Sequence, residues 1–210
     1  MILTTLGLLW SAATGCAEPA GADLAIRSDS LDRLFTRGRP FAEFLSQVRS
    51  RRETWTSNYT NAVLPPELLE RARAVAGSWR FLVVAEDWCG DSANAIPYLA
   101  RLVDSVSSLG LRVIGTADGK GVMEAHRTPD GRAATPTVVL LDGAGQDAGC
   151  FVERPAALRT WLDANRGTLP ERELNAGRDE WRRKDAGRET LREIVELLEA
   201  AARGERLCPP

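Results

Sequence analysis

The sequence has few of the residues that build metal sites: one histidine, His126, and four cysteines, no two of them spaced as a Cys-x-x-Cys pair. These shortages argue against a histidine-rich metal centre and a zinc ribbon, so we expect no metal, and no motif calls for another cofactor. The formal net charge is only −2, which lacks the positive excess of a nucleic-acid-binding domain. No run reaches the roughly 18 consecutive apolar residues of a membrane-spanning helix. The composition therefore argues against a nucleic-acid partner and against a membrane-spanning segment.

What the chain does contain is the composition of a globular protein, with 44% hydrophobic and 27% charged residues among 210. This length corresponds to about one domain with additions. Such a chain buries roughly 70% of the surface that its unfolded form exposes, so it does not need disulfide bonds for stability.

The first 16 residues are uncharged and form a compact apolar run that ends in the small residues 11–15 and then Cys16. This segment resembles a bacterial lipoprotein signal, in which the cysteine after the small residues is lipidated. It departs from that pattern because no Lys or Arg precedes the apolar run, and Ala13 stands where a larger aliphatic residue is usual. We expect export to the cell envelope, with a lipid on Cys16 as the only membrane attachment. A cytoplasmic protein whose first residues form an ordinary buried helix is the alternative.

Apolar periodicity predicts the secondary structure of the remaining chain. Residues 39–79 have helical spacing, broken at Leu64-Pro65-Pro66. Beyond them the predicted elements are strand 81–85, helix 91–107, strand 111–116, strand 137–141, hairpin turn 142–145, antiparallel strand 146–152, helix 155–162 and amphipathic helix 190–203. A strand, a helix and a strand in this order imply a parallel pair of strands with a crossover.

These elements predict an α/β fold, in which helices flank a central mixed β-sheet and extra helices lie at both ends of the chain. The predicted organisation is a signal segment 1–16, a linker 17–38, an N-terminal helical extension 39–79, a central domain 80–166, a C-terminal helical extension 167–203 packed on that domain, and a tail 204–210.

Cys89 stands between the first predicted strand and the helix that follows it, in the sequence Trp88-Cys89-Gly90-Asp91-Ser92. A thiol at a helix N-terminus faces unpaired backbone N–H groups and the positive end of the helix dipole. Both favour the thiolate, the form that attacks disulfides. Gly90 leaves room for a second sulfur or a peptide to approach. An inert buried cysteine is the alternative, since cysteine is among the most buried residue types.

Residues 81–162 resemble the thioredoxin fold. The sequence around Cys89 is similar to the thioredoxin active-site motif, Pro97 matches the proline within the active-site helix, and Thr135-Pro136 resembles the cis-proline loop. The resemblance implies that Cys89 is the attacking thiol, and that the substrate is contacted by Trp88, Gly90, Thr135 and Pro136. The runs 85–92 and 184–188 further resemble a bacterial group of thioredoxin-like proteins with added helices at both ends.

Three features depart from the dithiol thioredoxin pattern. Ser92 stands where such proteins have their second active-site cysteine, so the resemblance implies a monothiol protein that works through a mixed disulfide. Val83 replaces the buried aspartate of thioredoxins. Glu86, Asp87 and Asp91 place negative charge near the thiol, which would disfavour the thiolate unless these carboxylates point into solvent. The Ser92 hydroxyl is expected either to donate a hydrogen bond to the thiolate or to bond to the backbone.

The other candidate residues are expected to have structural roles, with one possible exception. Cys150 is expected at a plain edge-strand position, and Cys208 in a loose C-terminal end from which it could resolve a mixed disulfide at Cys89, if the two Cα atoms lie within roughly 7 Å. His126 is expected to be solvated in a surface loop, and the charged cluster 178–188 to be a solvated helix face.

The sequence thus favours a monothiol thioredoxin-like protein that performs thiol–disulfide exchange on protein or glutathione-type disulfides. In this hypothesis Cys89 attacks, Ser92 assists, Trp88 shields the site, and the loop at Thr135-Pro136 holds the substrate chain. The alternative is a non-catalytic binding or adaptor module that uses the same surface, because a fold does not guarantee an activity.

Overall fold

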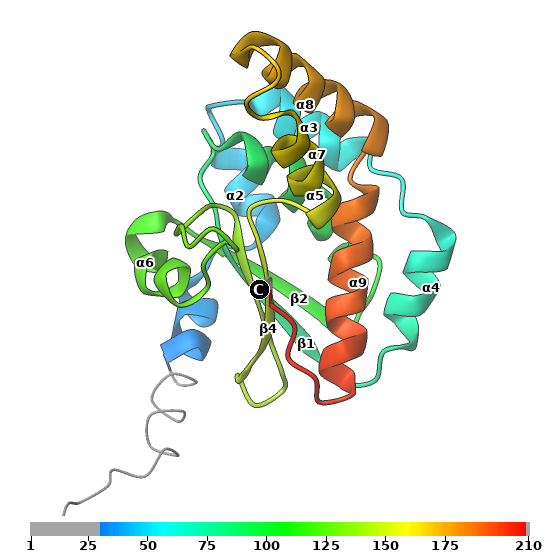
Figure 1. The fold of residues 1–210 in the computed structure, drawn as a ribbon. Helices are drawn as coiled ribbons and strands as arrows, with labels where there is room; N and C mark the ends of the chain where they lie inside the picture. Colours follow the sequence, from blue (N-terminus) through cyan, green and yellow to red (C-terminus); the bar gives the residue numbers. More distant parts are fainter. Residues whose placement is uncertain (1–29, 209–210) are drawn as a thin grey trace, which may run out of the picture.

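A four-stranded mixed sheet lies at the centre of the computed structural model, which describes residues 30–208 (Figure 1). The strands have the order β2-β1-β3-β4, with β1 parallel to β2 and antiparallel to β3, and β3 antiparallel to β4. Their bounds are β1 (Trp79–Val84), β2 (Leu109–Ile114), β3 (Thr137–Leu141) and β4 (Asp147–Val152). The predicted α/β fold with a parallel crossover and a hairpin is confirmed.

Helices cover both faces of this sheet. They are α2 (Phe41–Gln47), α3 (Arg52–Thr60), α4 (Pro66–Ala74), α5 (Gly90–Asp104), α6 (Thr116–Ala125), α7 (Ala156–Asn165), α8 (Glu171–Asp185) and α9 (Arg188–Ala202), and residues 30–37 are also helical. No helix in this described part of the chain is long and apolar enough to cross a membrane.

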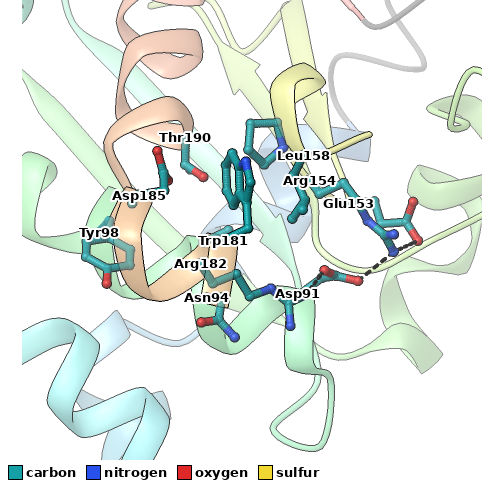
Figure 2. Close-up of a pocket in the computed structure, with 13 residues that line it drawn as sticks. Asp91, Asn94, Tyr98, Glu153, Arg154, Leu158, Trp181, Arg182, Asp185 and Thr190 are labelled. Atoms are coloured by element: carbon teal, nitrogen blue, oxygen red, sulfur yellow. Dashed lines mark hydrogen bonds and ion pairs between the residues drawn. The ribbon is translucent and has the colours of Figure 1, made fainter. Parts of the chain in front are cut away.

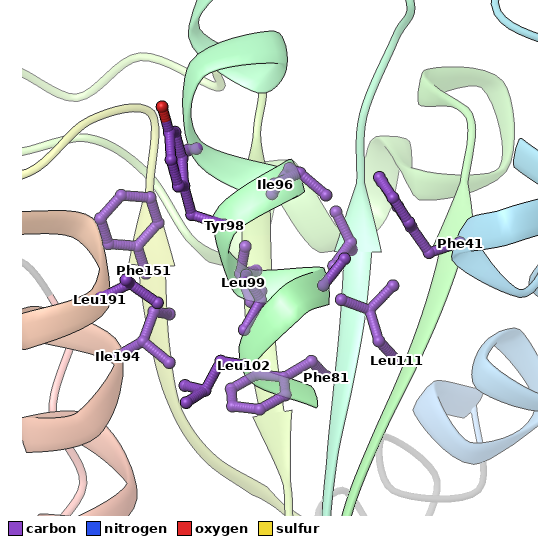
Figure 3. Close-up of a cluster of buried hydrophobic side chains, with 14 of the residues drawn as sticks. Phe41, Phe81, Ile96, Tyr98, Leu99, Leu102, Leu111, Phe151, Leu191 and Ile194 are labelled. Carbon is purple, nitrogen blue, oxygen red and sulfur yellow. The ribbon is translucent and has the colours of Figure 1, made fainter. Parts of the chain in front are cut away.

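The side chains of β1 alternate between two hydrophobic clusters. Phe81 and Val83 face the larger cluster, which contains side chains of α2, α3, α4, α5 and α9 (Figure 3). Leu82 and Val84 face a smaller cluster formed with α6 and with residues 31–35. Because residues 81–84 are buried on both faces of the sheet, this part of β1 is a continuous apolar run.

The linker predicted over 17–38 is wrong for its last part. Residues 30–37 form a helix, and Leu31, Leu34 and Phe35 pack against the smaller cluster. Asp32 adds an ion pair to Arg80 of β1 at 2.5 Å. The rest of the predicted linker and the predicted signal segment, with Cys16, lie outside the described residues.

The C-terminal tail is attached to the sheet up to Cys208. A disulfide bond joins Cys208 to Cys150 of β4, and the N–H of Cys150 donates to the carbonyl of Leu207 at 2.7 Å. The tail therefore runs back beside β4 (Figure 1). The expectations of a plain Cys150 and a free Cys208 are both wrong.

His126 is buried, with 5% of its surface exposed, so the prediction of a solvated histidine is also wrong. It ends α6, where its Nδ1 lies 2.8 Å from the carbonyl of Val122 and its Nε2 lies 2.8 Å from Asp147. Burial raises the pKa of the Asp147 carboxyl, but hydrogen bonds from His126 and Arg206 outweigh that effect, and the pKa is lowered. This network fastens α6 and the tail to the start of β4.

Candidate functional site

Cys89 is the N-cap residue of α5, directly after β1 and the short loop that follows it. Its Sγ accepts a hydrogen bond from the N–H of Ser92 at 3.4 Å, and its thiol donates to the carbonyl of Thr135 at 3.3 Å. The thiol thus takes the place that a Ser or Asp oxygen occupies at many helix N-termini, where it satisfies an otherwise unpaired N–H group. Only 8% of the Cys89 surface is exposed, so the residue is buried.

The Thr135–Pro136 peptide bond is cis and lies beside the thiol. The carbonyl of Pro136 accepts the N–H of Glu153 at 2.7 Å, which ties the loop to the end of β4. Within residues 30–208 the N–H of Thr135 donates to no backbone carbonyl. The structure therefore brings together two pairs of residues, Cys89 with Ser92 and Thr135 with Pro136, that are more than 40 residues apart in the sequence.

Trp88 and Gly90 flank the thiol in the chain, but they differ in exposure. Trp88 is 60% exposed, which does not agree with the expected shielding role and leaves the indole open to contact a partner. Gly90 is half-buried and begins α5. Ser92 is fully buried, and its Oγ has no hydrogen-bond partner among the described residues. Its backbone N–H, not its hydroxyl, contacts the sulfur.

The three carboxylates around the motif do not point freely into solvent. Oε1 of Glu86 accepts hydrogen bonds from both the N–H and the hydroxyl of Thr116, each at 2.7 Å. Thr116 is the first residue of α6, so Glu86 caps that helix and faces its positive end.

Asp87 is held by the turn between α2 and α3. Its Oδ2 accepts the backbone N–H groups of Arg49 at 2.9 Å and Ser50 at 3.0 Å. These hydrogen bonds lower the pKa of the Asp87 carboxyl, and the bond from Ser50 has the larger effect. The Asp87 carbonyl also accepts the indole N–H of Trp55 at 2.9 Å. The N-terminal helices therefore fix the loop that carries Cys89.

Asp91, in the first turn of α5, lies between two arginines in a small pocket at α5, α7, α8 and α9 (Figure 2). Arg154 contacts its Oδ2 at 2.8 Å, and Arg182 of α8 is ion-paired to its Oδ1. The side chains of Asp91, Arg154 and Arg182 are only 17%, 13% and 12% exposed. Burial lowers the pKa of Arg182, and Asp91 opposes that shift.

Each acidic group near the thiol thus has a positive or N–H partner, which reduces its repulsion of a thiolate. The sequence alone did not indicate Arg154 or Arg182 as members of the site, nor Arg51, whose Nε donates to the carbonyl of Trp88. The expectation that cluster 178–188 is a solvated face is wrong for Arg182, because this side chain turns inward to Asp91. No residue of α8 is buried, so its sequence does not indicate which of its charged side chains turns inward.

Cys89 is the one free cysteine among residues 30–208, because Cys150 and Cys208 are bonded to each other. No cluster of His, Cys, Asp and Glu side chains in that part of the chain could hold a metal ion. The chemistry that the arrangement allows is therefore that of a single thiol at a helix N-terminus beside a cis-proline loop.

Comparisons with known proteins agree with this geometry. A family model described as Thioredoxin matches residues 38–166, more than half of the chain. The match begins before α2, so the family pattern includes helices that we expected to be an extension. No curated protein matches the chain.

Two solved structures share the fold. A protein of unknown function from Pseudomonas aeruginosa aligns with a TM-score of 0.63 and 23% identity, over 80% of this chain and 96% of that one. An HIV epitope scaffold aligns with a TM-score of 0.63 and 20% identity, over 80% of this chain and 97% of its own. Given the family match and the shared fold, this chain belongs to the thioredoxin family.

Proposed function

We propose that this protein performs thiol–disulfide exchange through a mixed disulfide at Cys89, as a monothiol member of its family. The observation that carries the proposal is the position of the Cys89 sulfur. It accepts the Ser92 N–H at the start of α5 and lies 3.3 Å from the Thr135 carbonyl, next to the cis peptide bond.

In the first step the Cys89 thiolate attacks one sulfur of a disulfide R–S–S–R′. A bond forms between Sγ and the sulfur of R, the S–S bond breaks, and R′ leaves as a thiolate that takes a proton from solvent. Loss of the thiol proton ends the hydrogen bond to Thr135, while the Ser92 N–H continues to stabilise the sulfur anion. The N–H of Thr135, which donates to no backbone carbonyl of residues 30–208, supports the proposal that an extended substrate chain binds here.

In the second step a thiol R″–SH from solution attacks the sulfur of R, as its thiolate. This forms R–S–S–R″ and releases the Cys89 thiolate, so that R–S–S–R′ and R″–SH become R–S–S–R″ and R′–SH. We propose an external thiol because, among residues 30–208, Ser92 replaces a local second cysteine and Cys150 is bonded to Cys208. Protein disulfides and glutathione-type disulfides are the substrates we propose.

The Cys150–Cys208 disulfide supports the proposal that the protein works in an oxidising compartment, the cell envelope. A cytoplasmic location, the alternative, predicts free thiols at both positions in protein taken directly from cells. Mass spectrometry of such protein, alkylated before lysis, distinguishes the two and also detects a lipid on Cys16.

The test of activity is the reduction of a small disulfide and of a glutathionylated peptide by excess thiol. Wild type should accelerate both reactions, and Cys89→Ser should reduce the rate to the background without protein. A Cys150→Ala/Cys208→Ala variant, assayed where it is folded, should retain the wild-type rate. Equal rates for wild type and Cys89→Ser would contradict the proposal.

A binding module without turnover is the second candidate, favoured by the low exposure of Cys89 and by the exposed Trp88 beside it. For such a module, Cys89→Ser would bind its partner as wild type does and Trp88→Ala would not. The activity assay separates the two functions, because only exchange requires the sulfur.

A further inference from the structure

Arg51 is placed against the active-site loop by an unusual backbone conformation. It is the N-cap residue of α3 and has φ 52° and ψ 25°, a left-handed conformation that is uncommon for a residue with a side chain. Its Nε donates a hydrogen bond to the carbonyl of Trp88 at 2.8 Å. The turn between α2 and α3 therefore aims this guanidinium at the segment that contains the thiol.

Two guanidinium groups meet beside Gly90, the residue that follows Cys89. A Cβ atom on Gly90 would lie 3.6 Å from Cζ of Arg51 and 3.9 Å from a terminal nitrogen of Arg182. Both distances are of ordinary van der Waals length, so both guanidinium groups lie against the first residue of α5. Gly90 follows Cys89 directly, and their Cα atoms are about 3.8 Å apart, so the two guanidinium groups lie next to the backbone that carries the thiol.

The charges of the two arginines are not equally available. Arg182 is ion-paired to Asp91, but Arg51 has no ion pair with any carboxylate of residues 30–208. None of the three nearby carboxylates is ion-paired to Arg51: Glu86 is bound to Thr116, Asp87 to the N–H groups of Arg49 and Ser50, and Asp91 to the arginines of the pocket. One guanidinium without an ion pair therefore lies against Trp88 and Gly90, the residues on either side of Cys89.

We propose that Arg51 is a specificity-determining residue that binds a carboxylate located next to the sulfur atoms of the substrate disulfide. The inference rests on the proposed exchange at Cys89 and narrows its substrates to anionic disulfides, whether a small molecule or an acidic protein segment supplies the carboxylate. Arginine suits this role because its planar guanidinium donates two parallel hydrogen bonds to a carboxylate, and here only Nε is already in use.

The test compares three small disulfides that carry carboxylates (3,3′-dithiodipropionate), hydroxyl groups (2-hydroxyethyl disulfide) or amines (cystamine). Second-order rates of their reaction with Cys89 are measured on the full chain. Each rate of a variant is divided by the wild-type rate with the same disulfide, which removes the intrinsic reactivity of the reagent. Arg51→Met should slow the carboxylate reagent about fivefold relative to the hydroxyl reagent, and should speed the amine reagent by a similar factor.

Two control variants separate this effect from others. Arg51→Lys keeps the charge and should keep most of the preference. Arg52→Met removes a neighbouring exposed arginine whose guanidinium contacts the carbonyl of Val48, and it should leave the ratios within about twofold of wild type. A shift of the loop would change the rates of all three reagents equally in Arg51→Met, and that result would overturn the inference, as would equal effects of Arg51→Met and Arg52→Met.

Failure of the exchange function is recognised separately. If wild type reacts with none of the three disulfides, the proposed function fails and the inference falls with it. If all three react but the ratios do not depend on Arg51, only the inference fails. If the ratios do depend on Arg51, two further reagents show whether a small molecule or a protein segment supplies the carboxylate: glutathione disulfide, and a peptide disulfide with glutamate beside its cysteine. A loss in Arg51→Met with either one supports the proposal, and a loss with neither overturns it.

Discussion

Arg182 is ion-paired to Asp91 across 91 residues of sequence, and the pair joins α8 to the first turn of α5 (Figure 2). Asp91 lies two residues from Cys89, and its carboxylate would repel a thiolate if no cation balanced it. The C-terminal helices therefore contribute to the electrostatics of the thiol, although they contain none of the motif residues.

Arg182→Met should slow the alkylation of Cys89 by iodoacetamide about three- to tenfold at neutral pH. The reason is that Asp91 would then be balanced by Arg154 alone. The same change should cost about 1–3 kcal/mol of unfolding free energy, because a buried carboxylate loses one partner. Asp91→Asn/Arg182→Met should restore most of the alkylation rate, since no unbalanced charge remains. If the double variant is as slow as the single one, charge is not the cause.

Asp87 should make the stability of the protein depend on acid pH. Its carboxyl has a lowered pKa in the folded state, so its contribution is present above the ordinary carboxyl range and is lost as the pH falls through the folded-state value. We expect wild type to exceed Asp87→Asn in unfolding free energy at pH 7, and the difference to shrink between about pH 5 and pH 3. Urea titrations at several pH values measure it; a difference that is constant with pH would contradict this role.

The Cys150–Cys208 disulfide should contribute stability but not exchange. The bond closes a loop with a sequence separation of 58, for which the chain-entropy relation gives about 4 kcal/mol. Cys150→Ala/Cys208→Ala should therefore lower the midpoint of urea unfolding, while Cys89 alkylation in the folded protein stays at the wild-type rate. A fall in the alkylation rate without unfolding would show that the tail influences the site.

Gly187 should be required for the placement of α8. It joins α8 to α9 with φ 79°, and a methyl group there would overlap the ring of Tyr98. Gly187→Ala should cost about 2–4 kcal/mol of unfolding free energy, from backbone strain and overpacking together. Gly204→Ala is the matched control, since Gly204 has φ 77° but open space around its Cα, and it should cost only about 1 kcal/mol. Equal costs would mean that contact with Tyr98 has no part in the effect.

The fold could be predicted from the sequence because its signals are local. The strand 137–141 has the predicted bounds, and Cys89 is the N-cap residue of α5, as its place between an apolar run and an amphipathic helix indicated. The disulfide and the buried His126 could not be predicted, because their partners come from distant segments and neither pair leaves a periodic pattern. Arg182 was missed for a related reason: an arginine on a polar helix has the same pattern whether it meets solvent or a buried carboxylate.

The most direct test of the account is the site at which the protein forms a mixed disulfide. Wild-type protein is incubated with glutathione disulfide, quenched with acid and analysed by intact mass and peptide mapping. We predict one glutathione adduct within residues 30–208, located on Cys89, which disappears when excess thiol is added. A protein that stays unmodified at Cys89, or that carries its adduct on Cys150 or Cys208, would contradict the central claim.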